Sequence, residues 1–165
     1  MIQRLQTLFL ILALIANGLM FSFEFWSASA ANDSDRVVEQ LSLGLTHLSY
    51  ETTLQDKRAA SETHVYLIGL HGLASLLGLG AIFLYTNRTF QLRVSRLAML
   101  LETGLLVLLL FYTDGATKDY FSNSVSNSSY QLGIFLPIVS ILCFFMANLF
   151  IIRDEQKVRS AERLR

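Results

Sequence analysis

Two ionisable side chains, His71 and Glu102, stand inside long apolar stretches of this sequence. A charged side chain at the centre of a membrane helix costs about 2.5–3.5 kcal/mol on insertion scales. We therefore expect Glu102 to be neutral, paired with another group, or turned toward a polar interior. Two interpretations stay open: a proton or cation site, and a hydrogen bond between helices that fixes their packing.

The face of the helix that carries His71 predicts how this side chain is oriented. Small residues recur on that face at spacings of three or four, and small residues let helix backbones approach closely. We expect the face to point into a bundle, although a rise of 1.5 Å per residue leaves His71 and Glu102 roughly 7 Å apart along the axis. The face comprises His71, Ala74, Gly78, Ala81 and Tyr85.

Two asparagines, Asn17 and Asn148, also lie in apolar stretches. A hydrogen bond between membrane helices is worth about 0.6 kcal/mol on average. Both residues are candidates for such bonds. Pro137 lies in the same stretch as Asn148, and we expect it to kink that helix, with Gly133 limiting the clash.

The residues available for catalysis and metal binding are few. The three histidines are His47, His64 and His71, and a zinc site needs three or four convergent ligands. His64 and His71 fall on one helix and cannot hold a haem from opposite sides. Cys143 is the single cysteine, so no internal disulfide can form. The sequence predicts no catalytic residue, no metal site and no cofactor.

The composition and its arrangement predict an all-α membrane protein. Of 165 residues, 53% are hydrophobic and 16% are charged, and the formal net charge of zero argues against nucleic acid as a partner. A spanning helix needs about 20 mostly apolar residues. Four stretches satisfy this in one domain of residues 1–165, and we expect helices at 5–26, 64–85, 92–112 and 130–152. A water-soluble bundle would show polar stripes that these stretches lack.

The third and first stretches each carry a complication. In the third, Arg93 and Arg96 must extend to the headgroups for the helix to fit. The first resembles a signal peptide, because Arg4 precedes the apolar core and Ala-Ser-Ala at 28–30 could be cleaved after Ala30. Its apolar stretch exceeds the usual ~7–15 residues of a signal core, which favours an uncleaved helix. Both interpretations place the amino terminus in the cytoplasm.

The distribution of basic residues predicts the orientation. Cytoplasmic segments of membrane proteins are enriched in Lys and Arg. With the amino terminus inside, the cytoplasmic parts hold nine of the thirteen basic residues, so both termini are expected in the cytoplasm. These nine are Arg4, Arg88, Arg93, Arg96, Arg153, Lys157, Arg159, Arg163 and Arg165.

Two outer segments, 27–63 and 113–129, complete the expected topology. In the first, Leu41, Leu43 and Leu45 alternate with small residues, and Leu48 and Tyr50 follow after a slip of one residue. This pattern predicts a short strand or hairpin, with a bulge as one option, in a small cap over the bundle. The alternative is an irregular loop on the headgroups. The second segment is rich in Ser and Asn and is expected to be flexible.

The cytoplasmic tail, residues 153–165, is predicted to continue the fourth helix. Glu155 precedes Arg159 by four residues, a favourable spacing for a side-chain pair. The tail is either a solvated helix end or a docking face for a protein or an anionic lipid. Eight basic residues are the candidate contacts: Arg88, Arg93, Arg96, Arg153, Lys157, Arg159, Arg163 and Arg165.

Three stretches that fall on the predicted cytoplasmic side carry a resemblance to a known family. They are residues 1–7 (MIQRLQT), 87–93 (NRTFQLR) and 154–165 (DEQKVRSAERLR). Together they resemble the uncharacterised bacterial four-helix membrane proteins of the domain of unknown function 4293. The family usually has a basic residue after the loop arginine, where this chain has Thr89 and Phe90. The resemblance implies a bacterial inner-membrane location and four spans, and it supplies no activity.

These observations favour a non-enzymatic scaffold or accessory subunit of a membrane complex, since the most distinctive sequence lies on the cytoplasmic face. Membrane lipids and a membrane or cytoplasmic protein are the expected partners. The alternative is a small proton-coupled transporter or channel component that uses Glu102 and His71. Lipid binding between the helices is a third hypothesis. The sequence does not define the oligomeric state.

Overall fold

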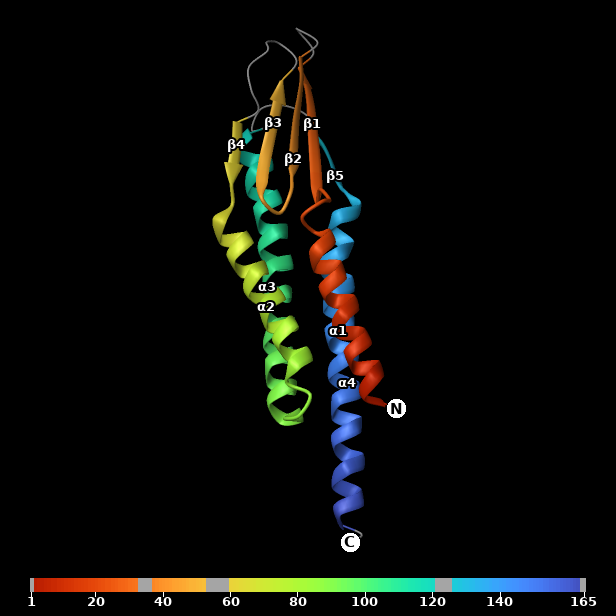
Figure 1. Ribbon diagram of the computed structural model, residues 1–165. Coiled ribbons are helices and arrows are strands. Elements are labelled where there is room, and N and C mark those ends of the chain that lie inside the picture. Colours follow the sequence, from red (N-terminus) through yellow and green to blue (C-terminus); the bar gives the residue numbers. More distant parts are fainter. Residues whose placement is uncertain (1, 33–36, 53–59, 121–125, 164–165) are drawn as a thin grey trace.

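The structure, a computed structural model, describes residues 2–32, 37–52, 60–120 and 126–163 (Figure 1). Four helices run side by side and a five-stranded sheet lies beyond one end of them. The helices are α1 (Ile2–Leu19), α2 (Val65–Phe83), α3 (Arg88–Tyr120) and α4 (Phe135–Arg163), with the short 3-10 helix η1 (Leu132–Ile134) before α4. The strands are β1 (Trp26–Asn32), β2 (Val37–Leu43), β3 (His47–Thr52), β4 (Ala60–Thr63) and β5 (Ser126–Tyr130).

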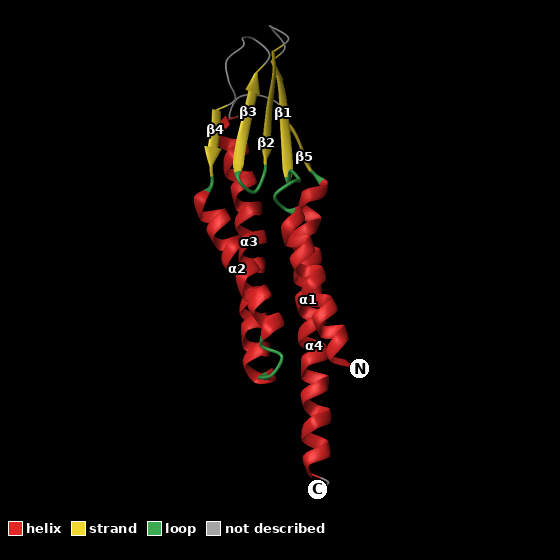
Figure 2. Ribbon diagram, in the orientation of Figure 1, coloured by secondary structure: helices red, strands yellow, loops and turns green. Residues whose placement is uncertain are grey.

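The antiparallel sheet corrects the expectation of an all-α protein. Its strand order is β4-β3-β2-β1-β5, and Figure 2 shows these strands gathered at one end of the helices. Small and polar residues alternate with apolar ones in β1 and β2, a period of two that suits a strand with one buried face. The apolar face packs on the upper part of α3, where Leu109 and Ala116 are buried with Trp26 and Leu41.

The hairpin predicted in the first outer segment is confirmed. Strands β2 and β3 pair antiparallel, with Leu43 opposite Leu48. The slip of one residue in the leucine pattern is the turn between them, closed where the Gly44 amide donates to the His47 carbonyl over 3.0 Å. Leu41, Leu43 and Leu48 are buried, so the alternation marks the core face of the sheet.

The second outer segment is more ordered than the Ser and Asn content predicts. Residues 126–130 form β5, which pairs with β1 and places Tyr130 opposite Trp26. Residues 113–120 extend α3 beyond the predicted end at 112. The expectation of a flexible segment is therefore wrong for both parts, because the backbone of β1 and the apolar face of the sheet supply partners that local composition does not show.

The first helix ends earlier than predicted, at Leu19 rather than at residue 26. The chain turns after Met20, the Phe25 amide donates to the Leu43 carbonyl over 2.8 Å, and β1 begins at Trp26. Phe25 and Trp26 are 0% and 2% exposed, so they belong to the core under the sheet. The Ala-Ser-Ala sequence of the alternative signal peptide lies inside β1, paired on both sides.

Each helix buries one narrow face and exposes large apolar side chains. On α3 the buried positions alternate in steps of three and four, the spacing of left-handed helical bundles. This face comprises Gln91, Ser95, Ala98, Glu102, Leu105, Leu109, Thr113 and Ala116. Outward side chains such as Leu76, Leu100 and Phe111 are 66%, 64% and 72% exposed. A largely apolar exterior is the arrangement expected of helices surrounded by lipid.

Among the described residues, three helical segments are long and apolar enough to cross a membrane: Val65–Phe83, Arg88–Ala116 and Leu132–Val158. They point to a membrane protein. The apolar part of α1, Leu5–Leu19, is shorter. Helix α2 begins and ends within two residues of the predicted 64–85. Helix α4 begins at Phe135, five residues after the predicted start, and continues to Arg163 into the predicted helical tail. Helix α3 starts four residues earlier and ends eight residues later than predicted.

Pro137 does not kink α4 in the way the sequence predicts. It lies in the first turn of the helix, where its missing amide proton costs no helical hydrogen bond. Gly133 has a different role from the predicted one, because it lies in η1 against the backbone of Glu24. A Cβ atom at Gly133 would lie 2.7 Å from the Glu24 carbonyl carbon, so only glycine permits this close approach.

Candidate functional site

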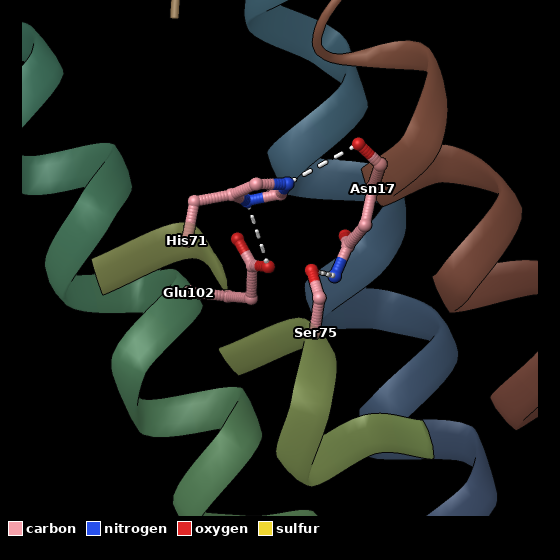
Figure 3. A network of polar contacts seen from close by, with 4 residues as sticks. All are labelled: Asn17, His71, Ser75 and Glu102. Carbon is pink, nitrogen blue, oxygen red and sulfur yellow. Dashed lines mark hydrogen bonds and ion pairs between the residues drawn. The ribbon is translucent and has the colours of Figure 1, made fainter. Parts of the chain in front are cut away.

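His71 and Glu102 are in direct contact. His71 Nδ1 lies 3.4 Å from Glu102 Oε1, and the two side chains are 1% and 0% exposed (Figure 3). The axial offset inferred from the predicted helix ends is wrong because the connection between α2 and α3 is tight. Gln91 Nε2 donates to the Ala81 carbonyl over 2.9 Å, and these residues lie eleven and ten positions from Glu102 and His71. The two side chains therefore lie at the same height.

Asn17 joins α1 to this pair. Its backbone carbonyl lies 3.2 Å from His71 Nε2, and its side-chain Nδ2 donates to Ser75 Oγ over 3.2 Å. Figure 3 shows the four side chains converging from three helices. The hydrogen bond between helices predicted for Asn17 is thus present, and α1, α2 and α3 meet at one polar layer.

The hydrogen bond to Asn17 fixes the tautomer of the histidine. A backbone carbonyl can only accept, so His71 Nε2 carries a proton. In a neutral ring Nδ1 then has no proton and faces Glu102 Oε1 with a lone pair. The contact is favourable when one further proton sits between these two atoms, on the carboxyl group or on the ring. The Phe21 ring packs edge-on against His71, with 5.4 Å between ring centroids.

The fourth helix contributes Ser140 at this height. The Phe9 and Phe150 rings stack 5.4 Å apart and set the register of α1 and α4. Ser140 lies ten residues from Phe150 and Asn17 lies eight from Phe9, so their heights differ by roughly 3 Å. Ser140 is fully buried. We call Asn17, His71, Ser75, Glu102 and Ser140 the polar layer.

Several oxygen atoms of the polar layer have no hydrogen-bond partner among the described residues. They are both Glu102 carboxyl oxygens, Asn17 Oδ1 and Ser140 Oγ. Buried polar atoms in proteins almost always have partners, and an exception asks for an explanation such as a function. Here the explanation must account for a carboxyl group whose nearest polar contact is one histidine nitrogen.

Further buried polar residues continue from the polar layer toward the end that carries the termini. Gln91 and Ser95 share the buried face of Glu102 on α3, while Gln6 on α1 and Asn148 on α4 are 2% and 5% exposed. The Asn148 side chain forms no hydrogen bond within the described part of the chain, so the bond between helices predicted for it is absent there. We call these four residues the lower polar set.

Gly78 shows why the small-residue face of α2 points inward. A Cβ atom there would lie 2.8 Å from the ring of Phe144 on α4. His71, Ala74, Gly78 and Ala81 are buried as predicted. Tyr85, the last member of the predicted face, is 58% exposed because α2 ends at Phe83 and the chain turns.

The comparison with protein families covers almost the whole chain. A family model described as Domain of unknown function (DUF4293) matches residues 2–164. The chain belongs to this family. No curated protein matches the chain. Membership of the DUF4293 family confirms the resemblance seen in the three short stretches and assigns no activity.

The basic residues of this DUF4293 protein that were predicted to contact a partner or lipid differ in their surroundings. Arg88 forms an ion pair with Asp154, with Nη1 3.1 Å from Oδ2, and donates to the Asp154 carbonyl over 3.2 Å. Arg93 and Arg96 are exposed on α3. Arg153 is exposed and lies over the Phe150 ring, and Lys157 is exposed. Arg159 and Arg163 lie on α4, and Arg165 lies outside the described residues.

Sequence reasoning did not identify Ser75, Ser140 or the lower polar set other than Asn148. The spacing of three and four residues on α3 could have found two of them, because Gln91 and Ser95 precede Glu102 by eleven and seven positions. Ser140 had no such signal. It takes its place in the polar layer from the register of α4 against α1.

Proposed function

We propose that this DUF4293 protein is a non-enzymatic scaffold or accessory subunit of a bacterial inner-membrane complex. It docks a membrane or cytoplasmic protein through the end of the bundle that carries both termini. The observation that carries this proposal is the projection of α4 beyond the other three helices (Figure 1). Membrane lipids surround the four helices.

The pattern of exposure supports four spans rather than three. The exposed residues of α1 are large and apolar, as on the other helices, with Leu8, Ile11 and Ile15 45–53% exposed. The helix packs along α4 with its Phe9 ring on Phe150. A cut after Ala30 would remove α1 and divide β1, which pairs with both β2 and β5. These observations favour an uncleaved first helix inside the membrane.

The position of the connections supports an orientation with both termini in the cytoplasm. The amino terminus, the α2–α3 connection and the end of α4 lie at the end opposite the sheet (Figure 1). Nine of the thirteen basic residues belong to that end, whereas residues 27–63 at the sheet end contain six acids and three bases. Cytoplasmic ends of membrane proteins carry such an excess of Lys and Arg.

The terminal part of α4 supports a docking role. The Arg88–Asp154 pair ties the α2–α3 connection to α4, and the helix continues past it to Arg163. The C-terminal end of α4 extends past the ends of the other three helices (Figure 1). An isolated helix of this length is marginal in water, because helical stability comes mostly from tertiary packing. A partner that packs on the exposed Lys157 and Val158 would supply that packing.

The test is the mass of the protein after extraction in mild detergent, by native mass spectrometry. We expect a complex with a second protein at fixed stoichiometry, lost in the Arg153→Glu/Lys157→Glu variant. The matched control is Gln40→Glu, an exposed site on the sheet, which should retain the complex. A wild-type chain that is found alone, or only with copies of itself, contradicts the proposal.

A second candidate function is a small proton-coupled transporter or channel component that uses Glu102 and His71. Their 3.4 Å contact inside the bundle favours it, since carboxyl and imidazole groups in membrane spans form proton relays. Four helices would need further copies or a partner to enclose a conduit. A pH-dependent flux into vesicles should disappear in Glu102→Gln, and a flux that is unchanged in this variant removes this function.

A further inference from the structure

The contact between His71 and Glu102 has a chemical consequence that does not require transport. We propose that the polar layer is a binding site for a single proton, and that the proton enters from the end of the bundle that carries the termini. This deepens the second candidate function by naming the ligand and its route. It holds equally if the protein moves nothing across the membrane.

The proton count follows from the hydrogen bonds. His71 Nε2 keeps its own proton, because the Asn17 carbonyl can only accept. One more proton between His71 Nδ1 and Glu102 Oε1 makes the pair neutral overall, whichever atom holds it. Without that proton, a carboxylate would face the lone pair of a neutral ring in a fully buried site.

No other described charge can replace this proton. Around the pair lie Asn17 from α1, Phe21 from the turn after α1, Ser75 from α2 and Ser140 from α4, all without charge. The titratable side chain of α4 in the bundle is Cys143, which packs with the apolar cluster below the layer. The basic residues nearest along α3, Arg93 and Arg96, are exposed on other faces of that helix.

The oxygen atoms without a described partner mark places where hydrogen bonds could stabilise a proton on its route to the His71–Glu102 pair. Asn17 Oδ1 and Glu102 Oε2 accept no hydrogen bond from described residues. In Figure 3, the Asn17 amide lies beside the Glu102 carboxyl group, on the side that faces away from the α3 backbone. Carboxyl and amide oxygens both accept hydrogen bonds from water. A proton can reach the pair only through atoms of this kind, because apolar groups cannot hold it.

Polar groups of this kind continue toward the termini. Ser75 lies four residues below His71, and Ser95 and Gln91 follow on α3. Given the Phe9–Phe150 stack, Asn148 lies at about the height of Ser95, and Gln6 at about the height of Gln91. Successive positions differ by roughly 6 Å or less along the axis. Oxygen atoms of Ser95, Gln91, Gln6 and Asn148 are buried without described hydrogen-bond partners.

The opposite direction is closed by apolar side chains. Met20, Leu67 and Leu105 are 0% exposed and form the next layer toward the sheet, and Leu109 follows. The Phe21 ring, in the turn that follows α1, packs edge-on against His71. Thr113 and His64 are buried farther up, beyond these residues. Next to the pair the interior is therefore apolar toward the sheet, whereas toward the termini buried polar residues lie among the apolar Leu10, Ala98 and Phe144, and we take this difference to give the site one-sided access.

The first experiment detects the proton itself. Infrared difference spectra of the full-length protein are recorded across pH, where a carboxyl C=O band or an imidazolium ring band reports the proton. We expect one such band to titrate and to vanish in Glu102→Gln. In Glu102→Asp, which keeps a carboxyl group, the band should shift rather than vanish. If no band that depends on Glu102 titrates while the wild-type protein stays folded, the proposal is wrong.

The second experiment tests the route. After a rapid pH jump, the same band should change more slowly in Ser95→Ala/Asn148→Leu, by roughly tenfold, because the double variant removes polar atoms from the terminal side. The matched control is Thr113→Val, a buried hydroxyl on the same face of α3 beyond the apolar layer, with an unchanged rate expected. Equal rates in both variants, or a slower Thr113→Val, overturn one-sided access.

The infrared titration and the vesicle flux assay together separate the proton site from transport. A titrating band together with no flux into vesicles leaves a proton-binding site in a protein that does not transport. A flux that survives in a protein without a titrating band removes the proton site and leaves the transport to other residues.

Discussion

The two halves of the bundle, divided at Glu102, are built differently. Toward the sheet, the buried side chains are large and apolar, with Met20, Leu67 and Leu105 fully enclosed. Toward the termini, the interior holds alanines, Gly78 and the lower polar set around Leu10 and Phe144. The half toward the sheet, which we call the upper half, resembles the core of a water-soluble protein. Its buried apolar residues form one cluster with those of the sheet.

The difference shows what holds each half together. An apolar side chain gains little free energy by moving from lipid into a contact between helices, because both surroundings are apolar. Helices in lipid therefore associate through close packing and hydrogen bonds. The lower half follows this rule with small residues and polar groups. The upper half joins a sheet whose Trp26, Leu41 and Leu43 are buried, so it also gains from removing apolar surface from water. Substitutions in the two halves should therefore lower the free energy of unfolding by different amounts.

The largest effect is expected for a carboxyl group placed one turn above Glu102. Leu105→Glu puts this group at 0% exposure among apolar side chains, without a histidine beside it. We expect a loss of about 3 kcal/mol or more in the free energy of unfolding, since an unpaired buried charge is strongly destabilising. Thermal unfolding in detergent measures it. A Leu105→Glu protein as stable as the wild type would show that the upper half is not a closed apolar core.

The next largest effect compares two glycines. Gly133→Ala would place a methyl group against the Glu24 backbone, which cannot move without disturbing the start of β1. Gly78→Ala meets the end of the Phe144 ring, which can rotate away. Overpacking costs about 1–3 kcal/mol, and we expect Gly133→Ala near the top of this range and Gly78→Ala near the bottom. The same unfolding assay tests the order, and the reverse order would contradict it.

Glu102→Gln should lower the free energy of unfolding by less than Gly133→Ala, because it forces no side chain against the backbone. The amide keeps the shape of the carboxyl group and can still donate to His71 Nδ1. We expect a loss of about 1–2 kcal/mol, typical of weakening a hydrogen bond that involves a charged group. Glu102→Leu is the matched comparison, because it leaves His71 Nδ1 without a partner. A Leu variant more stable than the Gln variant would show that the contact does not stabilise the fold.

The sequence predicted the membrane helices and their inward faces because these depend on local pattern. Three of the four long apolar stretches correspond to described helices long enough to cross a membrane, and small residues at helical spacing predicted that His71 and Gly78 lie inside. The alternating leucines predicted the β2–β3 hairpin, since a strand with one buried face repeats every two residues.

Other features depend on contacts between distant segments, which no local pattern contains. Strand β5 exists because residues 126–130 pair with β1, about a hundred positions earlier in the chain. The end of α1 at Leu19 has the same origin, because the apolar residues up to Trp26 suit a helix and a strand equally well. The predicted axial offset between Glu102 and His71 is wrong because sequence patterns locate helix ends only to within a few residues.

The smallest effect is expected at the Arg88–Asp154 pair, where the lower half of the bundle meets water. The side chains are 25% and 14% exposed, so solvent screens the attraction. We expect Asp154→Asn to lower the free energy of unfolding by less than about 1 kcal/mol, and less still in high salt. Its effect on the projecting part of α4 should be larger than its effect on the bundle, because this pair joins the start of α3 to α4 just before that part. Hydrogen exchange should therefore speed up beyond Asp154 and stay unchanged at the polar layer. Equal changes in both places would mean that the tail and the bundle unfold as one unit, and the projecting helix would then need no partner to be stable.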